Sequence, residues 1–363
     1  MISMQGKRGL ALTAIAGALA LATVLGAFTW WNTNVFGDEE LCGGKLRQSE
    51  LDSVLDTRGR ISSTSAAGGD GIPEFRCSVQ RTSRFMGAQP MEISVNTAVH
   101  EPDFPFQSRV WRGPAAMTYF TAGVPGAVSE DRGWVALPRT CQGKAGFIAV
   151  GSRRLPDADE VTVVEAVMNR GKADRAVLAQ LLLQAAGRVA ADAGCASNDM
   201  KAAAELGKAP STSTTDPRAV CGVAGFALPS GAVDESEARV DRETVAAGDQ
   251  TWACDLHLAG SAEGQISFST SSDAHIVEGP MNAAEGFEPL PEGKGRIDGY
   301  NRAVLNCRSG KVYFGMRQDD AYKSLLLQQD GERYTKTSQA QFQSFLDSAG
   351  ARHGCPSVAV PLH

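Results

Sequence analysis

Residues 141–148 read CQGKAGFI, and residues 307–314 read CRSGKVYF. After a one-residue insertion the two stretches agree: each is a cysteine, then a Gly-Lys step, then an apolar run typical of a strand. The recurrence of one local sequence around a cysteine indicates that the chain contains one structural unit twice.

The other cysteines extend this match outward along the chain. All eight form four landmark pairs in order: Cys42 with Cys221, Cys77 with Cys254, Cys141 with Cys307, and Cys195 with Cys355. An even count in an exported chain predicts four structural disulfides, whereas a metal site would need more closely spaced cysteines. Four cysteines in a unit allow three pairings. We favour the first with the second and the third with the fourth in each unit.

The N-terminal residues predict where the protein resides. Residues 10–31, LALTAIAGALALATVLGAFTWW, carry no charge and would span about 33 Å as a helix. Lys7 and Arg8 precede this run, so the positive-inside rule places the N-terminus in the cytoplasm. We therefore expect a single-pass cell-membrane protein whose C-terminal bulk is extracellular. The alternative is a signal peptide cleaved after Ala20, which would leave an apolar tail without an evident use.

The landmarks also give an expected domain organisation. Residues 203–217 are rich in small and polar residues and have prolines near both ends, as linkers do. The expected parts are a cytoplasmic N-terminus at 1–9, a transmembrane signal anchor at 10–31, repeat unit 1 at 32–200, a linker at 201–220, and repeat unit 2 at 221–363.

Periodicity predicts an α+β fold: an N-terminal transmembrane helix followed by two similar domains, each a small antiparallel sheet with a packed C-terminal helix. Apolar residues recur at helical spacing over 178–189 and 342–349, just before the last cysteine of each unit. A further short helix is expected over 46–55. The expected strands are 91–99, 147–150, 161–168, 265–270, 311–316 and 324–328.

Charge and motifs narrow the function classes. The net charge is −6, and the part after residue 31 is more acidic still, which disfavours nucleic-acid binding. The hallmark motifs of serine hydrolases, zinc proteases and nucleotide-binding loops do not occur. We expect no catalytic, cofactor-binding or metal-binding residues, so the eight cysteines are the predicted site residues.

Two clusters of polar residues are candidate chemical sites. His100, Glu101 and Asp103 could form an acid–base group, but Pro102 and Pro105 favour a solvated loop after a strand. Asp255 and His257 occupy alternate positions of a strand, for which the ordinary interpretation is a surface ion pair.

Weaker patterns have simpler interpretations. They are Asp157, Asp159 and Glu160 as a solvated turn, Gly68–Gly71 as a loop, Lys144 and Lys311 as strand-entry residues, and Trp111, Trp134, Trp252, Phe104 and Phe106 as core aromatics.

The basic N-terminus, the apolar anchor, the paired cysteines and the Cys-Gly openings resemble uncharacterised membrane-anchored or secreted actinobacterial envelope proteins, and the units are similar to small lipoprotein domains of unknown function. The lipobox of those lipoproteins is missing here. The resemblance implies no catalytic residue.

The expected function is therefore a non-catalytic cell-envelope protein whose duplicated, disulfide-bonded ectodomain binds or assembles with another envelope component. The expected partners are the membrane, through one helix, and an envelope protein. The alternatives are an extracytoplasmic hydrolase with an unrecognised active site, for which His100, Glu101 and Asp103 are the first candidates, and a small-ligand-binding envelope protein.

Overall fold

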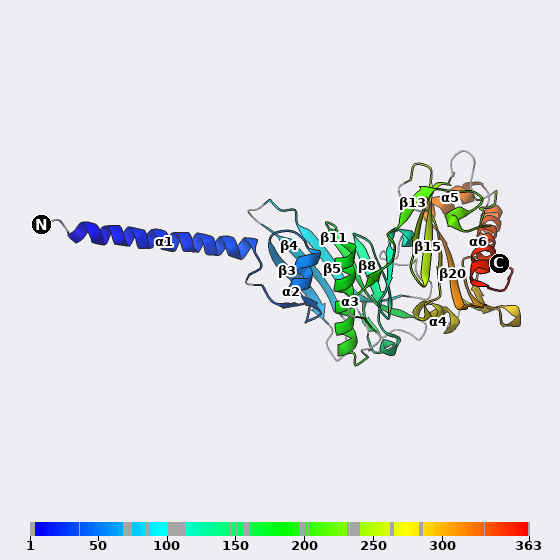
Figure 1. Ribbon diagram of the computed structural model, residues 1–363, viewed down its shortest axis with the longest axis horizontal. Helices are drawn as coiled ribbons and strands as arrows, with labels where there is room; N and C mark the ends of the chain where they lie inside the picture. The colour runs from blue at the N-terminus through cyan, green and yellow to red at the C-terminus, as the bar shows by residue number, and fades with distance from the viewer. Residues whose placement is uncertain are drawn as a thin grey trace.

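The computed structural model describes residues 4–35, 37–67, 75–83, 87–100, 113–145, 147–149, 152–154, 160–195, 200–201, 203–230, 232, 240–261, 265–282, 286–329 and 331–361. Within these residues it is a mixed helix and sheet structure with one N-terminal apolar helix and two eight-stranded antiparallel sheets. Figure 1 shows these parts in sequence along the long axis of the molecule, beginning with the helix.

The N-terminal helix α1 (Met4–Asn32) projects away from the rest of the protein (Figure 1). Its segment Ile15–Asn32 is only 6% buried and apolar enough to cross a membrane. A helix of this kind at the N-terminus is compatible with a membrane anchor or a signal sequence.

The first sheet has the strand order β12-β6-β7-β8-β11-β5-β4-β3. Its strands are β3 (Arg60–Ala67), β4 (Phe75–Thr82), β5 (Met91–His100), β6 (Thr118–Thr121), β7 (Pro125–Val128), β8 (Arg132–Ala136), β11 (Val161–Arg170) and β12 (Glu205–Leu206). The short pairs β1 (Glu40–Leu41) with β2 (Leu46–Arg47) and β9 (Phe147–Ala149) with β10 (Ser152–Arg154) lie outside this sheet. The helices of this part are α2 (Gln48–Val54) and α3 (Arg175–Asp192).

The second sheet has the order β13-β14-β15-β16-β20-β19-β18-β17. Its strands are β13 (Ser211–Thr214), β14 (Val240–Ala247), β15 (Thr251–Leu258), β16 (Ile266–Ser271), β17 (Glu288–Pro289), β18 (Gly295–Asp298), β19 (Arg302–Cys307) and β20 (Gly310–Gln318). Its helices are α4 (Ala274–Asn282), α5 (Asp320–Gln329) and α6 (Gly331–His353).

The two sheets share one pattern of connections. In each, three strands run as a meander (β3 to β5, and β14 to β16), the next three start at the far edge (β6 to β8, and β17 to β19), and the last strand, β11 or β20, fills the gap between the two groups. The sheets differ at their edges, where β12 extends the first sheet beside β6 and β13 extends the second beside β14.

The disulfide prediction is confirmed at matching places in this pattern. The bonds are Cys42–Cys77, Cys141–Cys195, Cys221–Cys254 and Cys307–Cys355. Cys77 and Cys254 lie in the middle strand of the meander of their sheets, β4 and β15, and no cysteine is free. The opening Cys42 and Cys221 both have left-handed backbones, with φ of 59° and 61°, each followed by a glycine that is also left-handed.

Three apolar clusters show which elements pack together. In the first, Leu178, Leu182 and Val189 of α3 pack with Val135 of β8 and Val164 of β11. In the second, α5 and α6 pack with β15, β16 and β20. The third cluster contains residues of both sheets, so the two sheets also bury apolar area against each other.

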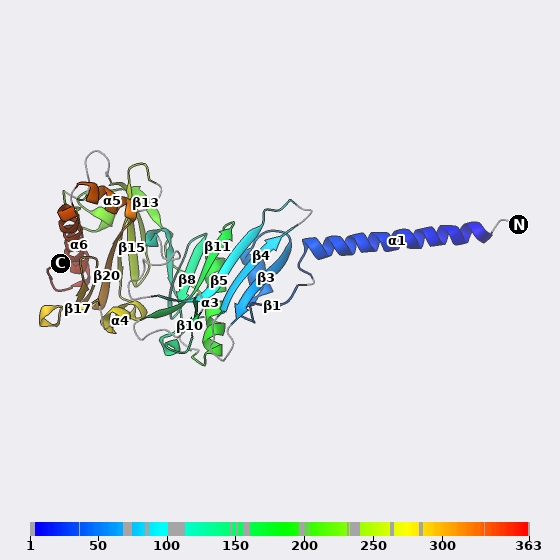
Figure 2. The ribbon, with the colours of Figure 1, turned by 180° about the vertical axis from the view of Figure 1, so that it is seen from behind.

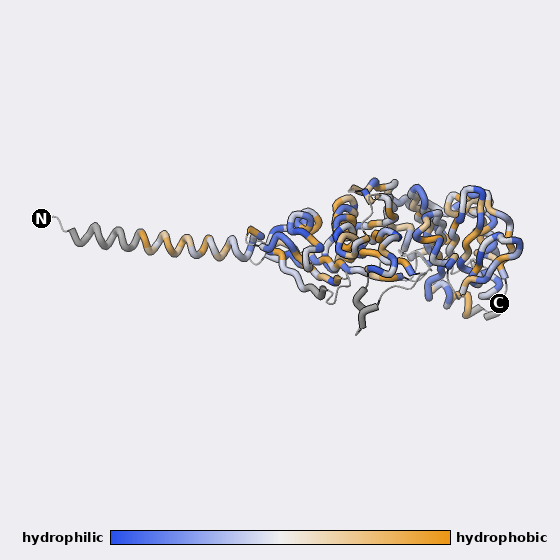
Figure 3. The backbone as a smooth tube through the Cα atoms, turned by 90° about the horizontal axis from the view of Figure 1, so that it is seen from below, coloured by the Kyte–Doolittle hydropathy of each residue, from blue (hydrophilic) through white to orange (hydrophobic). Residues whose placement is uncertain are grey.

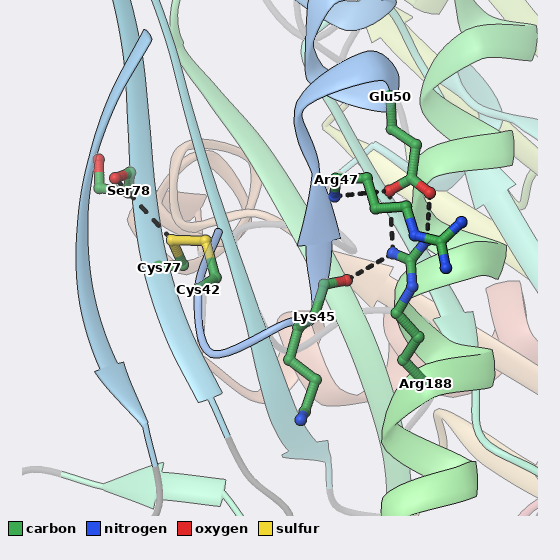
Figure 4. The surroundings of a disulfide bond; sticks show 7 residues. All are labelled: Cys42, Lys45, Arg47, Glu50, Cys77, Ser78 and Arg188. Carbon is green, nitrogen blue, oxygen red and sulfur yellow. Dashed lines mark hydrogen bonds and ion pairs between the residues drawn. A yellow bond between two sulfur atoms is a disulfide. The ribbon is translucent and has the colours of Figure 1, made fainter. Parts of the chain in front are cut away.

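Polar contacts fix the opening segment of the first part to its closing helix (Figure 4). The Arg188 guanidinium of α3 donates to the Lys45 carbonyl at 2.8 Å and to the Glu50 carboxylate at 2.9 Å. The same Glu50 carboxylate accepts the Arg47 backbone N–H at 3.0 Å at the start of α2. Because Arg188 and Glu50 are mostly buried, with side-chain exposures of 21% and 11%, this ion pair is better shielded from water than an ordinary surface pair.

The segment expected to be a linker contributes a strand to each sheet. Leu206 of β12 pairs with Phe120, and Thr212 of β13 pairs with Thr244. Between these strands the Gly207 N–H donates to the Tyr119 carbonyl at 2.8 Å. The connection is therefore held by backbone hydrogen bonds at both of its ends.

The structure corrects three local expectations. The predicted strand 324–328 is part of helix α5, because the Asp319 carboxylate caps the Tyr322 N–H at 2.7 Å and Tyr322 and Leu326 are buried one turn apart. The strand expected at 147–150 is β9 in a separate two-stranded ribbon, and β11 takes the place that β20 occupies in the second sheet. Both sheets are also larger than the small sheets expected.

We predict that Gly133→Ala destabilises the protein by about 1–3 kcal/mol, because the new Cβ would lie 2.7 Å from Val128 and 2.8 Å from Leu182 in a packed core. Gly187→Ala in α3 is the matched control, since nothing lies within 4 Å of its Cβ position and alanine favours a helix by about 1 kcal/mol. Chemical denaturation of the two variants checks this. Equal shifts in the two variants would contradict the packing of α3 against β8.

Candidate functional site: the boundary between the two sheets

The strongest candidate site lies where residues of both sheets meet. The apolar layer is formed by Ala115, Met117, Tyr119, Ala127, Trp134, Ala136 and Val163 from the first part and by Ala246, Ala253, Ile276, Val277, Phe287, Val304 and Tyr313 from the second. Trp134 of β8 is 2% exposed, so its indole is fully enclosed in this layer. This layer excludes water from the polar groups that border it.

Asp255 is the buried carboxylate of this boundary. It lies on β15 and is 3% exposed. Its Oδ2 accepts the Ala115 backbone N–H of the short helix η2 (Pro114–Ala116) at 3.2 Å, so the hydrogen bond joins the second sheet to the first part of the chain. Ser267 of β16 also hydrogen-bonds this carboxylate.

Burial shifts the protonation of this group. Desolvation raises the pKa of Asp255 to about 6, and the hydrogen bonds from Ser267 and Ala115 and the charge of Arg132 only partly oppose that rise. Burial also raises the pKa of Tyr119, with a smaller contribution from the Asp255 charge. The Tyr119 hydroxyl donates to the Pro114 carbonyl at 3.2 Å, which keeps the phenol neutral and bonded.

A second polar chain runs across the sheet next to Asp255. His257 Nε2 lies 2.9 Å from the Thr244 hydroxyl, which lies 3.0 Å from the Thr212 hydroxyl. These residues come from three neighbouring strands, β15, β14 and β13. His257 therefore acts in the cross-strand contacts that attach the edge strand β13.

A cavity of about 80 Å³ opens at the same boundary, between α4 and the residues before and after Cys141. Arg139 and Glu278 form an ion pair across it, linking the first part to the second. His275 also lines the cavity, and its Nδ1 lies 2.9 Å from the Asp273 carboxylate. The buried Thr162 hydroxyl on the cavity wall has no hydrogen-bond partner among the described residues.

This arrangement has limited chemical scope. About 80 Å³ holds a few water molecules or one very small polar molecule, far less than the several hundred cubic ångströms of a drug-sized pocket. Within the residues the structure describes, no three His, Cys, Asp or Glu side chains are grouped so as to hold a metal ion. The cavity is lined by the His275 imidazole, the Thr162 hydroxyl, the Glu160 carboxylate and the Arg139–Glu278 ion pair, and its small volume suits the binding of water or a very small polar molecule.

Of the predicted His100 cluster, the structure describes His100 alone. His100 ends β5, and its Nε2 lies 3.2 Å from Glu165 Oε2 on the neighbouring strand β11. Glu165 also accepts the Asn96 amide at 3.1 Å. Glu101 and Asp103 lie outside the described residues. The partner of His100 is thus a residue 65 positions away, on the strand that pairs with β5.

The surface ion pair expected for Asp255 and His257 is wrong. Both side chains are buried, at 3% and 8% exposed, and each bonds to other partners. Asp255 and His257 do occupy alternate positions of β15, but the face that they share is buried and not in water. The first sheet covers the outer face of the second sheet. Nothing in the local sequence of β15 encodes this contact.

The remaining predicted residues have simple positions. Lys144 and Lys311 are exposed, Trp134 is in the layer between the sheets, and Trp252 packs at 6.1 Å from Phe345 near the second core. Glu160 lines the cavity. Asp157, Asp159, Gly68–Gly71, Trp111, Phe104 and Phe106 lie outside the described residues.

Sequence reasoning missed Arg139, His275 and Glu278. Each looks like an ordinary polar residue near a turn or a short helix, and no spacing relates Arg139 to the other two. The one local signal was Asp273-x-His275 before an apolar stretch, a pattern that indicates a helix cap. Their proximity depends on how the two sheets pack.

Comparison with known proteins adds no functional information. No family model and no curated protein matches the chain. Among solved structures, the di-domain ARO/CYC StfQ from the steffimycin biosynthetic pathway is aligned over 82% of this chain and 91% of that chain, with 10% sequence identity and a TM-score of 0.11. A likeness that weak carries no argument about fold or activity.

Asp255 predicts a pH-dependent stability. Its pKa is raised to about 6 in the folded protein and is about 3.9 when unfolded, so the folded state binds the proton more tightly. The contribution of Asp255 to stability is therefore fully present below pH 4 and falls by about 3 kcal/mol as the pH rises through 6. Asp255→Asn should therefore raise the free energy of unfolding at pH 7.5 and change it little at pH 4.

Denaturant titrations at pH 4, 6 and 7.5 measure this effect. Asp347→Asn, at an exposed position of α6, is the control and should give the same shift at each pH. If Asp255→Asn behaved like Asp347→Asn, the carboxylate would be solvated in solution and the boundary between the sheets would be open.

Proposed function

We propose that this protein is a single-pass cell-envelope protein, with its N-terminus in the cytoplasm and a duplicated ectodomain that binds or assembles with another envelope component without catalysis. We also propose that the two parts are copies of one unit, each a sheet with a closing helix. It also includes the kinship with membrane-anchored or secreted actinobacterial envelope proteins indicated by the sequence.

The observation that carries the proposal is the exposed apolar helix joined to a disulfide-bonded domain. Leu19, Leu21, Val24 and Leu25 of α1 are between 55% and 65% exposed, which in water would be a costly surface. Four disulfides require an oxidising compartment outside the cytoplasm. A retained anchor with an extracytoplasmic ectodomain satisfies both requirements.

Binding without catalysis is supported by how the polar clusters are used. His100, His257 and His275 are each bonded to a neighbouring side chain that holds two elements together or caps a helix. A catalytic base needs an accessible position beside a substrate site. The cavity beside His275 has room for a few waters only.

The surface of the ectodomain favours a polar partner. Beyond α1, the large hydrophobic residues that are exposed among the described residues are Val35 and Leu327. Such scattered residues are normal on a protein surface in water and do not form a contiguous apolar interaction patch. A partner would therefore be recognised through hydrogen bonds and charge, with an acidic protein surface on this side.

The small-ligand alternative rests on the cavity with Arg139, His275 and Thr162. Native mass spectrometry of the full chain, purified unreduced in detergent, separates the two functions. A bare chain eight hydrogens lighter than the reduced mass is expected, which reflects the four disulfides. A reproducible small adduct that is lost in Arg139→Ala but kept in Arg218→Ala would overturn partner binding in favour of ligand binding.

Membrane retention gives a direct test of the anchor. Leu21→Arg places a charge in the middle of α1 at a cost of about 3 kcal/mol and should lower the fraction of chain that resists alkaline carbonate extraction. Leu327→Arg, an equally exposed leucine on α5, should leave that fraction unchanged. A wild-type chain that is fully extracted, or whose mass begins after Ala20, would contradict a retained anchor.

A further inference from the structure

The end of α1 is fixed to the first unit without a flexible stalk. Asn32, the last helical residue, is 2% exposed and its Oδ1 accepts the Ser83 hydroxyl at 2.6 Å. Two residues on, the Asn34 side chain accepts the Ile61 backbone N–H of β3 at 3.1 Å, and its carbonyl accepts the Gln48 amide at 3.3 Å. The direction in which the helix leaves the ectodomain is therefore set by hydrogen bonds (Figure 2).

The apolar run fixes the depth of this junction in a bilayer. From Leu10 to Trp31 a helix rises about 33 Å, close to the hydrocarbon thickness of about 30 Å. Trp30 and Trp31, at 45% and 41% exposed, then lie at the outer interface, where tryptophan is favoured. Figure 3 shows the hydrophobic colouring in the middle of the helix giving way to paler colours in the last turns before the ectodomain.

Arg60 lies at the same level as these tryptophans. Its guanidinium carbon is 4.0 Å from the centre of the Trp30 ring, so the first residue of β3 stacks on an interfacial side chain of the helix. Within the described residues, this guanidinium is in no ion pair or hydrogen bond. Its donors therefore remain available at the depth of the lipid headgroups.

We propose that Arg60, held against Trp30, binds the phosphate of an outer-leaflet phospholipid and so seats the first unit on the membrane surface. A guanidinium presents a planar fork of N–H groups that fits two phosphate oxygens, and one face of it stays free to stack on an indole. The neighbouring Arg58 is exposed and adds positive charge beside Arg60.

Acidic groups near the junction limit this contact to a local one. Asp56 and the run Asp38 to Glu40 are exposed and would repel an anionic surface, in line with the negative charge of the whole ectodomain. The contact therefore depends on the stacked geometry of Arg60 more than on bulk attraction. The inference rests on the proposed function, because it requires α1 to remain in the bilayer.

The test is a solid-state NMR measurement on the full chain reconstituted in phosphatidylcholine–phosphatidylglycerol bilayers. With ¹⁵N-labelled arginine, dipolar dephasing by lipid ³¹P reports guanidinium groups in contact with phosphate. Both chains carry Arg8→Gln, because Arg8 at the inner end of the apolar run would also be labelled and lie near lipid phosphate. The chain with Arg60 intact should show a dephased component that is lost in Arg60→Gln. Arg352→Gln, which removes an exposed arginine of α6 in the second unit, should keep that component.

A second measurement covers the case in which Arg60→Gln does not fold. A nitroxide on Ser62→Cys, an exposed position of β3, should relax strongly next to gadolinium-chelate headgroup lipids, whereas one on Ser309→Cys in the second unit should not. Equal ³¹P dephasing in the chain with Arg60 intact and in Arg60→Gln, or equal relaxation at both labelled positions, would overturn the lipid contact alone. A chain that does not enter the bilayer would overturn the anchor as well.

Discussion

Both faces of both sheets have to be covered, and the arrangement of the whole ectodomain depends on this constraint. Residues of α3 share an apolar cluster with the first sheet, and residues of α5 and α6 share one with the second. Part of the other face is apolar too, as Trp134 and Val163 in the first sheet and Val304 and Tyr313 in the second show. A single unit would leave these residues in water at a cost of about 25 cal/mol for each Å². The two units therefore stabilise each other by packing together.

The same constraint explains the unusual polar residues at the boundary. A strand that is half-buried in an isolated unit can place Asp255 in water, but the facing sheet removes that water. The η2 segment of the first unit replaces part of the lost solvation with the Ala115 N–H, and the remaining cost is the raised pKa. A buried carboxylate of this kind favours one relative position of the units, because any other position would remove the Ala115 donor and leave only Ser267.

The sequence was sufficient to predict the features that depend on local periodicity or on the repeated cysteine pattern. The cysteine landmarks gave the four disulfides, and the helical spacing before Cys195 and Cys355 gave α3 and α6. Short apolar runs gave weaker information: 324–328 has strand-like leucines, but a cap at Asp319 makes it a helix. The boundary could not be predicted, since Arg139 and Glu278 lie 139 positions apart and meet only through the packing of the sheets. The strand order that the two sheets share could not be predicted either. The residues after Cys141 form the separate ribbon of β9 with β10, so aligning residues 141–148 with 307–314 does not reveal the shared order.

The connection between the units affects how the ectodomain is cleaved by proteases and how it unfolds. Because β12 belongs to the first sheet and β13 to the second, the described residues 203–214 between the units are held by strand pairing, which makes this stretch a poor site for a protease. Gly207 passes so close to both sheets that an added Cβ would lie 2.9 Å from the Tyr119 carbonyl and 3.1 Å from that of Ala247. Separating the units requires an edge strand to detach from its sheet. We therefore expect the ectodomain to unfold in one cooperative transition and not as two independent domains.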